Sequence, residues 1–374
     1  MTDTPTRASA LSDYHLLGRS GLRVSPLCLG TMTFGTEWGW GSPKETAHLI
    51  LARYLDLGGN FIDTADGYTG GTSETIIGEY LRQPGVRDRV VLATKFSLGS
   101  TPGNPNSGGN GRKNIYRALE GSLRRLGTDY VDLYWLHAWD GITPVEEVLQ
   151  TLTDLVRAGK IRHAGLSDVP AWYYARAQTL AERDGLTPII ALQLEYSLVE
   201  RNIEREHIPA ALALGAAVTP WSPLASGLLS GKYSRRGGAP HGEGRLPAIA
   251  GSGNPGFTKL LTDRNWGIVD TLVAVARELG RPPAQVALRW IATRPGVGAT
   301  IIGATKLEQL ESNLCALDFE IPEALSQRLE EASRPELVHP YIFFVESFFK
   351  KMLGAGTTVR AEPRWFRPPK PPQG

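Results

Sequence analysis

Short apolar segments of strand length alternate with longer helical patterns along most of this chain. The strand-like segments lie at 27–30, 60–63, 90–95, 131–136, 161–166, 189–194, 216–219 and 299–302. The helical patterns that follow them lie at 44–57, 74–81, 114–126, 145–158, 171–182, 204–214, 265–279 and 307–314. Such alternation is typical of βα units with parallel strands. Eight units predict an α/β fold, a closed (β/α)8 TIM barrel.

Two of the predicted helices carry start signals. Ser42–Glu45 and Thr143–Glu146 each place a hydroxyl residue three positions before a glutamate, with proline directly after the hydroxyl residue. This pattern predicts a capping box with proline at the first helical position.

A doubly wound open sheet would share the alternation, but it places a glycine-rich phosphate turn after its first strand, and none follows segment 27–30. One G-x-G-x-x-G string does occur at 251–256, but it follows no predicted strand and has a proline where a helix should begin. We therefore interpret it as a loop and favour the barrel.

The barrel is predicted to occupy residues 14–333, after a flexible N-terminus at 1–13. Segment 226–264, rich in glycine and proline, is a long insertion between the seventh strand and its helix, and long loops in compact domains are usually functional or mobile. A C-terminal extension at 334–361 precedes a proline-rich tail at 362–374 that we expect to be disordered. The aromatic stretch 341–353 in this extension suits packing on the barrel, a subunit contact or a cover over a substrate pocket.

The composition argues for a small-molecule partner. The 40 basic and 38 acidic residues leave a net charge of +2, which gives no reason to expect nucleic acid or an anionic membrane as the main partner. Cys28 and Cys315 predict neither a disulfide framework nor a zinc site. The N-terminus lacks the apolar core of a signal peptide, and the longest apolar stretch, near 208–218, is shorter than a membrane span. We therefore expect a cytoplasmic protein.

Polar side chains follow the second, third and fourth predicted strands. The second ends at Asp63 and leads to Tyr68, the third ends at Lys95, and the fourth leads to His137. Taken singly, each has a structural alternative as a cap, a solvated charge or a core residue. Because barrel active sites lie at the carboxyl ends of the strands, the four together predict a proton-transfer site.

Tyrosine is a weak acid, with a free pKa of about 10, unless a cation stabilises its phenolate form. Lys95 can supply that charge, Asp63 can pair with the lysine, and His137 can orient a substrate carbonyl. The chain offers no nucleophile elbow and no clustered metal ligands. We expect no metal, and a hydride for carbonyl reduction must come from a cofactor.

These residues resemble the aldo-keto reductase family. The resemblance extends from about Tyr14 to Asp318, and its motifs are Asp63–Tyr68, Gly71–Glu74, Lys95, Val131–His137, Gly165–Asp168, Gln193, Trp221–Leu229 and Ile302–Lys306. It implies a catalytic tetrad of Asp63, Tyr68, Lys95 and His137, with Tyr68 as the general acid.

The resemblance also implies an extended NADPH bound without a Rossmann fold, with NADH as the less favoured alternative. Ser167, Asp168 and Gln193 would hold the nicotinamide amide, and Trp221 would stack on the ring. The pyrophosphate would lie along Ser222, Leu224, Gly227 and Leu228, under the long insertion, and Pro223 and Lys232 are further implied cofactor contacts.

The 2′-phosphate of NADPH would bind where the last strand leads into its helix. Thr305–Glu308 reads as a third capping box, and free backbone donors at a helix start favour an anion. Lys306 would supply charge, with Gln309 and Asn313 on the adenine side. The remaining implied cofactor contacts are Gly30, Thr31, Met32, Asp63, Ile302, Gly303, Ala304 and Thr305.

Two positions depart from the family pattern. The family usually has asparagine where Asp168 stands, and often arginine where Thr305 stands. A carboxylate has no amide hydrogen to donate to the nicotinamide carbonyl, although it can accept from the amide nitrogen.

Aromatic residues near the same rim predict a substrate pocket, formed by Phe34, Trp38, Trp40 and Trp139. Each could instead pack in the core. Such a pocket suits aryl or aliphatic aldehydes and ketones, and it also suits a nucleotide-linked keto-sugar. Relatives of the family also serve as NADPH-binding regulatory subunits of potassium channels, so a binding role with little turnover is the rival interpretation. The substrate, the physiological direction and any homo-oligomer stay open.

Overall fold

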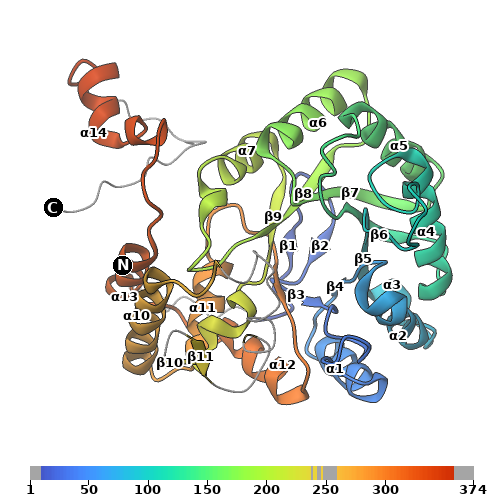
Figure 1. Cartoon of the computed structure of the whole chain (residues 1–374), viewed down its shortest axis with the longest axis horizontal. Helices are drawn as coiled ribbons and strands as arrows, with labels where there is room; N and C mark the ends of the chain where they lie inside the picture. Colours follow the sequence, from blue (N-terminus) through green and yellow to red (C-terminus); the bar gives the residue numbers. More distant parts are fainter. Residues whose placement is uncertain (1–9, 237–238, 242–245, 247–258, 358–374) are drawn as a thin grey trace, which may run out of the picture.

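The computed structural model describes residues 10–236, 239–241, 246 and 259–357. Its main feature is an eight-stranded parallel sheet (Figure 1), in which the strands follow one another in chain order and the last pairs with the first. The strands are β3 (Leu27–Gly30), β4 (Phe61–Asp63), β5 (Val91–Phe96), β6 (Val131–Leu136), β7 (Ile161–Ser167), β8 (Ile189–Glu195), β9 (Ala217–Trp221) and β12 (Thr300–Ile302).

The sheet closes on itself between β9 and the segment that leads into β12. The backbone N–H of Val218 donates to the carbonyl of Gly296 at 2.7 Å, and the N–H of Gly298 donates to the carbonyl of Val218 at 2.9 Å. The predicted TIM barrel is therefore confirmed.

Helices surround the barrel (Figure 1). They are α1 (Lys44–Asp56), α2 (Thr72–Leu81), α3 (Val86–Arg89), α4 (Arg112–Leu126), α5 (Val145–Arg157), α6 (Ala171–Asp184), α7 (His207–Leu214), α10 (Asp263–Leu279), α11 (Pro283–Ala292), α12 (Leu307–Leu314) and α13 (Glu323–Ser333). The sequence patterns did not predict α3, α11 or α13.

The predicted capping boxes at α1 and α5 were wrong. Pro43 and Pro144 occupy the N-cap positions, with extended ψ angles of 160° and 140°, and neither helix start has a side-chain cap. The hydroxyl residues therefore lie one position outside each helix, and Thr143 donates instead to Asp140 at 2.6 Å.

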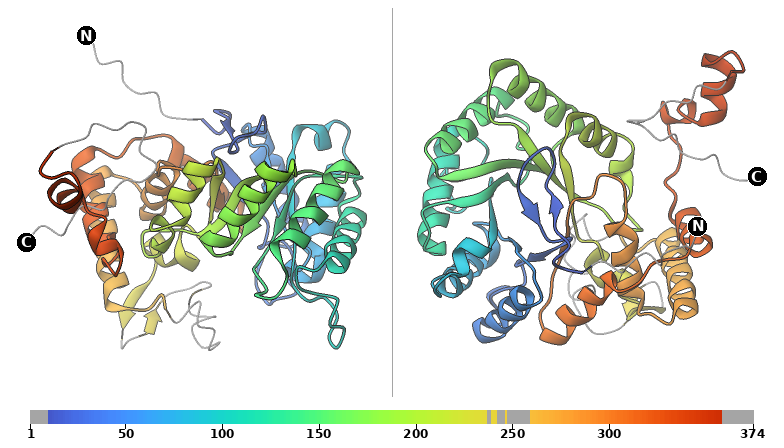
Figure 2. Two further views of the ribbon diagram at one scale, coloured as in Figure 1. Left: turned by 90° about the horizontal axis from the view of Figure 1, so that it is seen from above. Right: turned by 180° about the vertical axis from the view of Figure 1, so that it is seen from behind.

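The barrel interior is packed rather than hollow. A hairpin of β1 (His15–Leu16) and β2 (Arg23–Val24) lies across one end of the barrel (Figure 2), and Leu17 and Val24 join the interior cluster. Inside, Trp135 on β6 lies opposite Gly165 on β7, where a Cβ atom would come within 2.3 Å of the indole ring. The indole of Trp135 therefore fills the interior at this level of the barrel.

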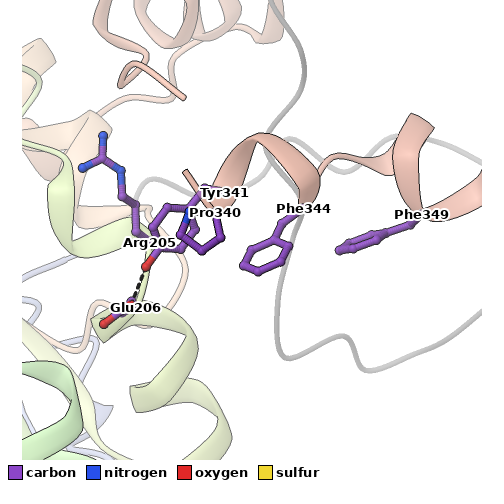
Figure 3. A pocket seen from close by; sticks show the side chains of 6 residues that line it. All are labelled: Arg205, Glu206, Pro340, Tyr341, Phe344 and Phe349. Carbon is purple, nitrogen blue, oxygen red and sulfur yellow. Dashed lines mark hydrogen bonds between the residues drawn. The ribbon is translucent and has the colours of Figure 1, made fainter. Parts of the chain in front are cut away.

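The C-terminal extension leaves the barrel after α13 (Figures 1 and 2). It carries η5 (Tyr341–Phe343), α14 (Glu346–Phe348) and η6 (Phe349–Leu353). The Tyr341 hydroxyl donates to Glu206, directly before α7. The rings of Tyr341, Phe344 and Phe349 form a row that leads away from Glu206 (Figure 3). Phe343 packs on Phe348, with ring centroids 5.2 Å apart, and Leu353 is 73% exposed. Packing on the barrel is thus concentrated at the Tyr341 end.

The long insertion is described only in part. It contains η3 (Ala225–Ser230), β10 (Ser234–Arg236) and β11 (Ala239–His241). The G-x-G-x-x-G string, the proline-rich tail and residues 1–9 of the N-terminus lie outside the described residues. Within the described residues, no helix is both long and apolar enough to cross a bilayer.

Candidate active site

Three adjacent strands bring four polar side chains together at the carboxyl end of the barrel. Asp63 ends β4, Lys95 lies near the end of β5, and His137 directly follows β6. The Lys95 ammonium is fully buried and donates to the Asp63 carboxylate, to the Thr64 carbonyl at 2.9 Å and to the Tyr68 hydroxyl at 3.1 Å. The four residues singled out in the sequence therefore form one constellation.

A left-handed turn presents Tyr68 to this group. Tyr68 begins η1 (Tyr68–Gly71), and Thr69, Gly70 and Gly71 have φ angles of 47°, 65° and 100°. Positive φ is uncommon for a β-branched residue and needs compensating contacts. Thr69 has them, because its hydroxyl donates to the Phe34 carbonyl at 2.9 Å and accepts from the Ser73 N–H at 3.1 Å.

Burial and charge act in opposite directions on Tyr68 and Lys95. Burial raises the pKa of Tyr68 above its usual value of 10.0, and Lys95 opposes that shift. Burial alone would lower the pKa of Lys95, but Asp63 and Tyr68 outweigh it, so the net direction is upward. The lysine thus stays cationic, while the phenol keeps its proton more firmly than the sequence led us to expect.

His137 is held as a neutral imidazole. Burial, followed by the charge of Lys95, lowers its pKa to about 3. Its ring lies edge-on to Tyr68, with centroids 5.9 Å apart, and its buried Nδ1 has no hydrogen-bond partner among the described residues. A neutral histidine here can share a hydrogen bond with a substrate oxygen without adding charge.

Gln193 and Ser97 also belong to this group, with contacts that the sequence did not predict. The Gln193 amide nitrogen donates to Asp63 Oδ1 at 2.9 Å, which leaves its carbonyl oxygen free of that bond. The Ser97 hydroxyl accepts from the backbone N–H of His137 at 3.1 Å. In the sequence, only the position of Ser97, a small polar residue two places after Lys95, could have indicated that it belongs to the site.

Asp168 and Trp221 meet beside the tetrad. The Trp221 indole N–H donates to Asp168 Oδ1 at 3.1 Å. Asp168 is exposed at the surface, but the groups packed around its carboxyl group desolvate it and raise its pKa to about 6, and the bond from Trp221 opposes that shift. Ser167 pairs in register with Gln193, so the four residues implied for the nicotinamide lie at the ends of β7, β8 and β9.

The loop after β9 has a run of left-handed backbone. Ser222, Ala225, Ser226 and Gly227 have φ angles of 52°, 48°, 56° and 93°. The N–H groups of this run bond within the loop. Those of Ala225 and Gly227 donate to the carbonyls of Ser222 and Leu224 at 2.8 and 2.9 Å, and that of Ser226 donates to the Ser222 hydroxyl at 3.3 Å.

The third predicted capping box, at α12, was wrong. Lys306 is the N-cap and no side chain caps the helix. Instead Gln309 Oε1 accepts from the Thr305 N–H at 2.9 Å, and the Asn313 amide donates to the Gly303 carbonyl at 3.4 Å. The neighbouring implied contacts, Gly30, Thr31, Met32, Ile302 and Ala304, lie at or just after the ends of β3 and β12, which pair with each other.

The predicted aromatic pocket divides into separate groups. Trp38 lies edge-on to Tyr68, at 6.4 Å between centroids, and packs on Trp40 at 5.5 Å. Trp139 instead packs on Trp172, at 5.8 Å. Phe34 is fully buried in the main hydrophobic cluster, so we do not retain it in the pocket.

A buried ion pair supports α2, which follows the Tyr68 turn. Glu74 is fully buried and accepts from Thr94 at 2.6 Å and from Arg125 Nε at 2.7 Å. We expect Arg125→Ala to lower the free energy of unfolding by roughly 3 kcal/mol, because it leaves a buried carboxylate without its cation. This value is at the lower end of the range for buried pairs, since the Arg125 side chain is 32% exposed and solvent weakens the pair. Urea denaturation measures this. The exposed pair partner Arg328→Ala is the control, and a loss equal to that of the control would contradict the prediction.

Comparison with known proteins agrees with this architecture. The model of the aldo/keto reductase family matches residues 26–334. The chain belongs to this family. It is 35% identical to an aryl-alcohol dehydrogenase of Pestalotiopsis microspora over 96% of this chain and 90% of the relative. It is 34% identical to the aryl-alcohol dehydrogenase [NADP(+)] of Phanerodontia chrysosporium over 87% of this chain and 86% of the relative. A probable voltage-gated potassium channel subunit beta of Oryza sativa is 38% identical over 82% of this chain and 91% of the relative.

Membership establishes the general chemistry. Aldo/keto reductases use nicotinamide cofactors, and this aldo/keto reductase is an oxidoreductase that acts on carbonyl and alcohol groups. The resemblance inferred from the strand-end residues is therefore confirmed.

Proposed function

We propose that this aldo/keto reductase reduces aromatic aldehydes or ketones with NADPH and that Tyr68 donates the proton. The observation that carries the proposal is the contact of 3.1 Å between the Tyr68 hydroxyl and the buried Lys95 ammonium, whose charge Asp63 holds in place. This contact favours loss of the phenol proton as negative charge develops on a carbonyl oxygen.

The residues present fit a nicotinamide dinucleotide phosphate. Trp221 offers an indole face, Gln193 Oε1 is free of the bond to Asp63, and the loop that follows β9 would line the pyrophosphate. The exposed Lys306, at the start of α12, would meet the 2′-phosphate. NADPH, when bound, supplies the hydride.

The side chains of the tetrad then have separate tasks. His137, held as a neutral imidazole, would orient the carbonyl oxygen near the Tyr68 hydroxyl. Tyr68 would donate its proton to that oxygen as the hydride reaches the carbon. Lys95 would stabilise the resulting phenolate, and Asp63 would keep Lys95 in position.

Trp38 supports an aromatic substrate. It lies edge-on to Tyr68 and is 42% exposed, so a planar ring can pack against it beside the reacting carbonyl. The two aryl-alcohol dehydrogenases among the relatives have names that agree with this substrate class.

We expect Trp38→Ala to raise KM for benzaldehyde-type substrates about fivefold, because one stacking contact is worth roughly 1 kcal/mol. The KM for a short aliphatic aldehyde should change little. Steady-state kinetics with both substrates measure this, and Trp172→Ala, in the separate aromatic group, is the control. Equal increases for the aromatic and the aliphatic substrate would contradict an aromatic pocket at Trp38.

The test of the whole proposal is NADPH consumption, followed by its near-ultraviolet absorbance, with a panel of aldehydes, ketones and keto-sugars. Reduction of aryl carbonyls supports the proposal, and a preference for keto-sugars would replace the substrate class. Tight NADPH binding with negligible turnover on every substrate would favour a regulatory role, as the name of the Oryza sativa relative indicates for that protein.

A further inference from the structure

Asp168 is a carboxylate held in one place at the rim. Its φ angle is 46°, its N–H donates to the Gln193 carbonyl at 3.2 Å, and its carbonyl accepts from the Trp139 N–H at 3.3 Å. Aspartate is among the few residues that adopt left-handed φ readily. With Trp221 donating to Oδ1, both the backbone and the side chain of Asp168 are fixed between the ends of β7 and β9.

The charge of Asp168 acts on the reaction centre. The Asp168 charge is one of the influences that raise the pKa of Tyr68, and the Lys95 charge in turn lowers the pKa of Asp168. Asp168 also bonds through its backbone to Gln193, whose side chain contacts Asp63. The carboxylate is therefore coupled both to the tetrad and to the indole proposed to stack on the nicotinamide.

The two redox states of the cofactor differ in charge at this point. The oxidised nicotinamide ring is a cation, and the reduced ring is neutral. A fixed carboxylate beside the ring attracts the cation and has no comparable attraction for the neutral ring. An asparagine of the same shape would not make this distinction.

We propose that Asp168 makes the cofactor site discriminate between redox states, so that NADP+ binds more tightly relative to NADPH than it would with asparagine at this position. The inference rests on the proposed function, because it requires the nicotinamide to lie on Trp221. In the reduction step, a hydride leaves the reduced ring for the carbonyl carbon, and the Tyr68 proton moves to the oxygen. Asp168 stabilises the cationic ring that remains, so the equilibrium on the enzyme shifts toward alcohol and NADP+.

Other charges near Asp168 bear on the pH dependence. Glu195 at the end of β8 raises the pKa of Asp168, whereas Lys95 and Lys259 lower it. Lys259 is paired with Glu195 at 2.6 Å and with Glu200 at 3.2 Å. Because the pKa of Asp168 is raised to about 6, the carboxylate charge is present above that pH and is lost as the pH falls through it.

The experiment measures Kd for NADP+ and for NADPH separately, by quenching of tryptophan fluorescence and by calorimetry, in the intact chain without substrate. We expect Asp168→Asn to raise the ratio of Kd for NADP+ to Kd for NADPH by on the order of tenfold, the effect of one unit charge a few ångströms away at a solvent-facing site. Asp168→Glu, which keeps the charge, should stay nearer to wild type. Asp140→Asn removes a carboxylate that accepts from the Asn110 N–H and the Thr143 hydroxyl, and it should leave the ratio unchanged.

Each outcome has one meaning. If Asp168→Asn leaves the ratio at the wild-type value while both forms still bind, the inference is overturned and the proposed function stands. If wild type binds neither form, the proposed function fails first. A ratio that rises in wild type between pH 7 and pH 5, but not in Asp168→Asn, supports the inference. Equal pH dependence in the two proteins would assign the effect to another group and contradict it.

Discussion

Replacing Tyr68 by phenylalanine is expected to lower kcat for aldehyde reduction by about 10²- to 10⁴-fold, which is roughly the contribution of one general acid. The Kd for NADPH should stay close to the wild-type value. The phenol oxygen is the group that Lys95 contacts at 3.1 Å, and phenylalanine has no proton to donate. The ring itself remains to pack against Trp38 and His137. Steady-state kinetics together with fluorescence titration of the cofactor measure both quantities.

A matched control is Tyr80→Phe, which removes a hydroxyl from α2, where the ring packs on His48. It should leave kcat and Kd at wild-type values. Retention of more than a tenth of the wild-type kcat in Tyr68→Phe would show that another group or water donates the proton. Loss of NADPH binding in the same variant would instead mean that Tyr68 acts on the cofactor.

Lys95→Met is expected to have the second largest effect and to act on two quantities at once. It should lower kcat by about 10²-fold or more, because Lys95 opposes the upward shift that burial imposes on the Tyr68 pKa, and without it the phenol becomes a still weaker acid. It should also lower the free energy of unfolding by about 3–5 kcal/mol, because the Asp63 carboxylate stays buried without its cation.

The double variant Asp63→Asn/Lys95→Met separates the two effects. With no charge left unpaired, most of the stability should return in urea denaturation, but kcat should stay low because no cation faces Tyr68. Recovery of activity together with stability would mean that Lys95 merely supports the fold. An unchanged free energy of unfolding in Lys95→Met would contradict the burial of the pair.

The barrel could be predicted because each βα unit has its own local signature. Apolar runs such as 131–136 indicate buried strands, and patterns such as 145–158 repeat apolar residues with the period of a helix. In a βα fold, strands that follow one another in the chain lie side by side. The same logic located Asp63, Lys95 and His137, because a polar residue at the end of each of three successive strands must reach the same rim. Helix starts were less accurate, since a proline at 43 or 144 fits either the N-cap or the first helical position.

The sequence by itself determined the fold class, the family and the set of residues that meet at the rim, since all three depend on local periodicity and on motifs that each occupy a few consecutive positions. Only the tertiary structure decided which side chains contact one another. It linked Gln193 to Asp63 and Trp221 to Asp168, buried Phe34, and grouped Trp139 with Trp172 rather than with Tyr68. The physical reason is that these contacts join residues far apart in the chain, and their geometry depends on the backbone angles of loops such as the turn at Thr69, which the sequence pattern does not encode.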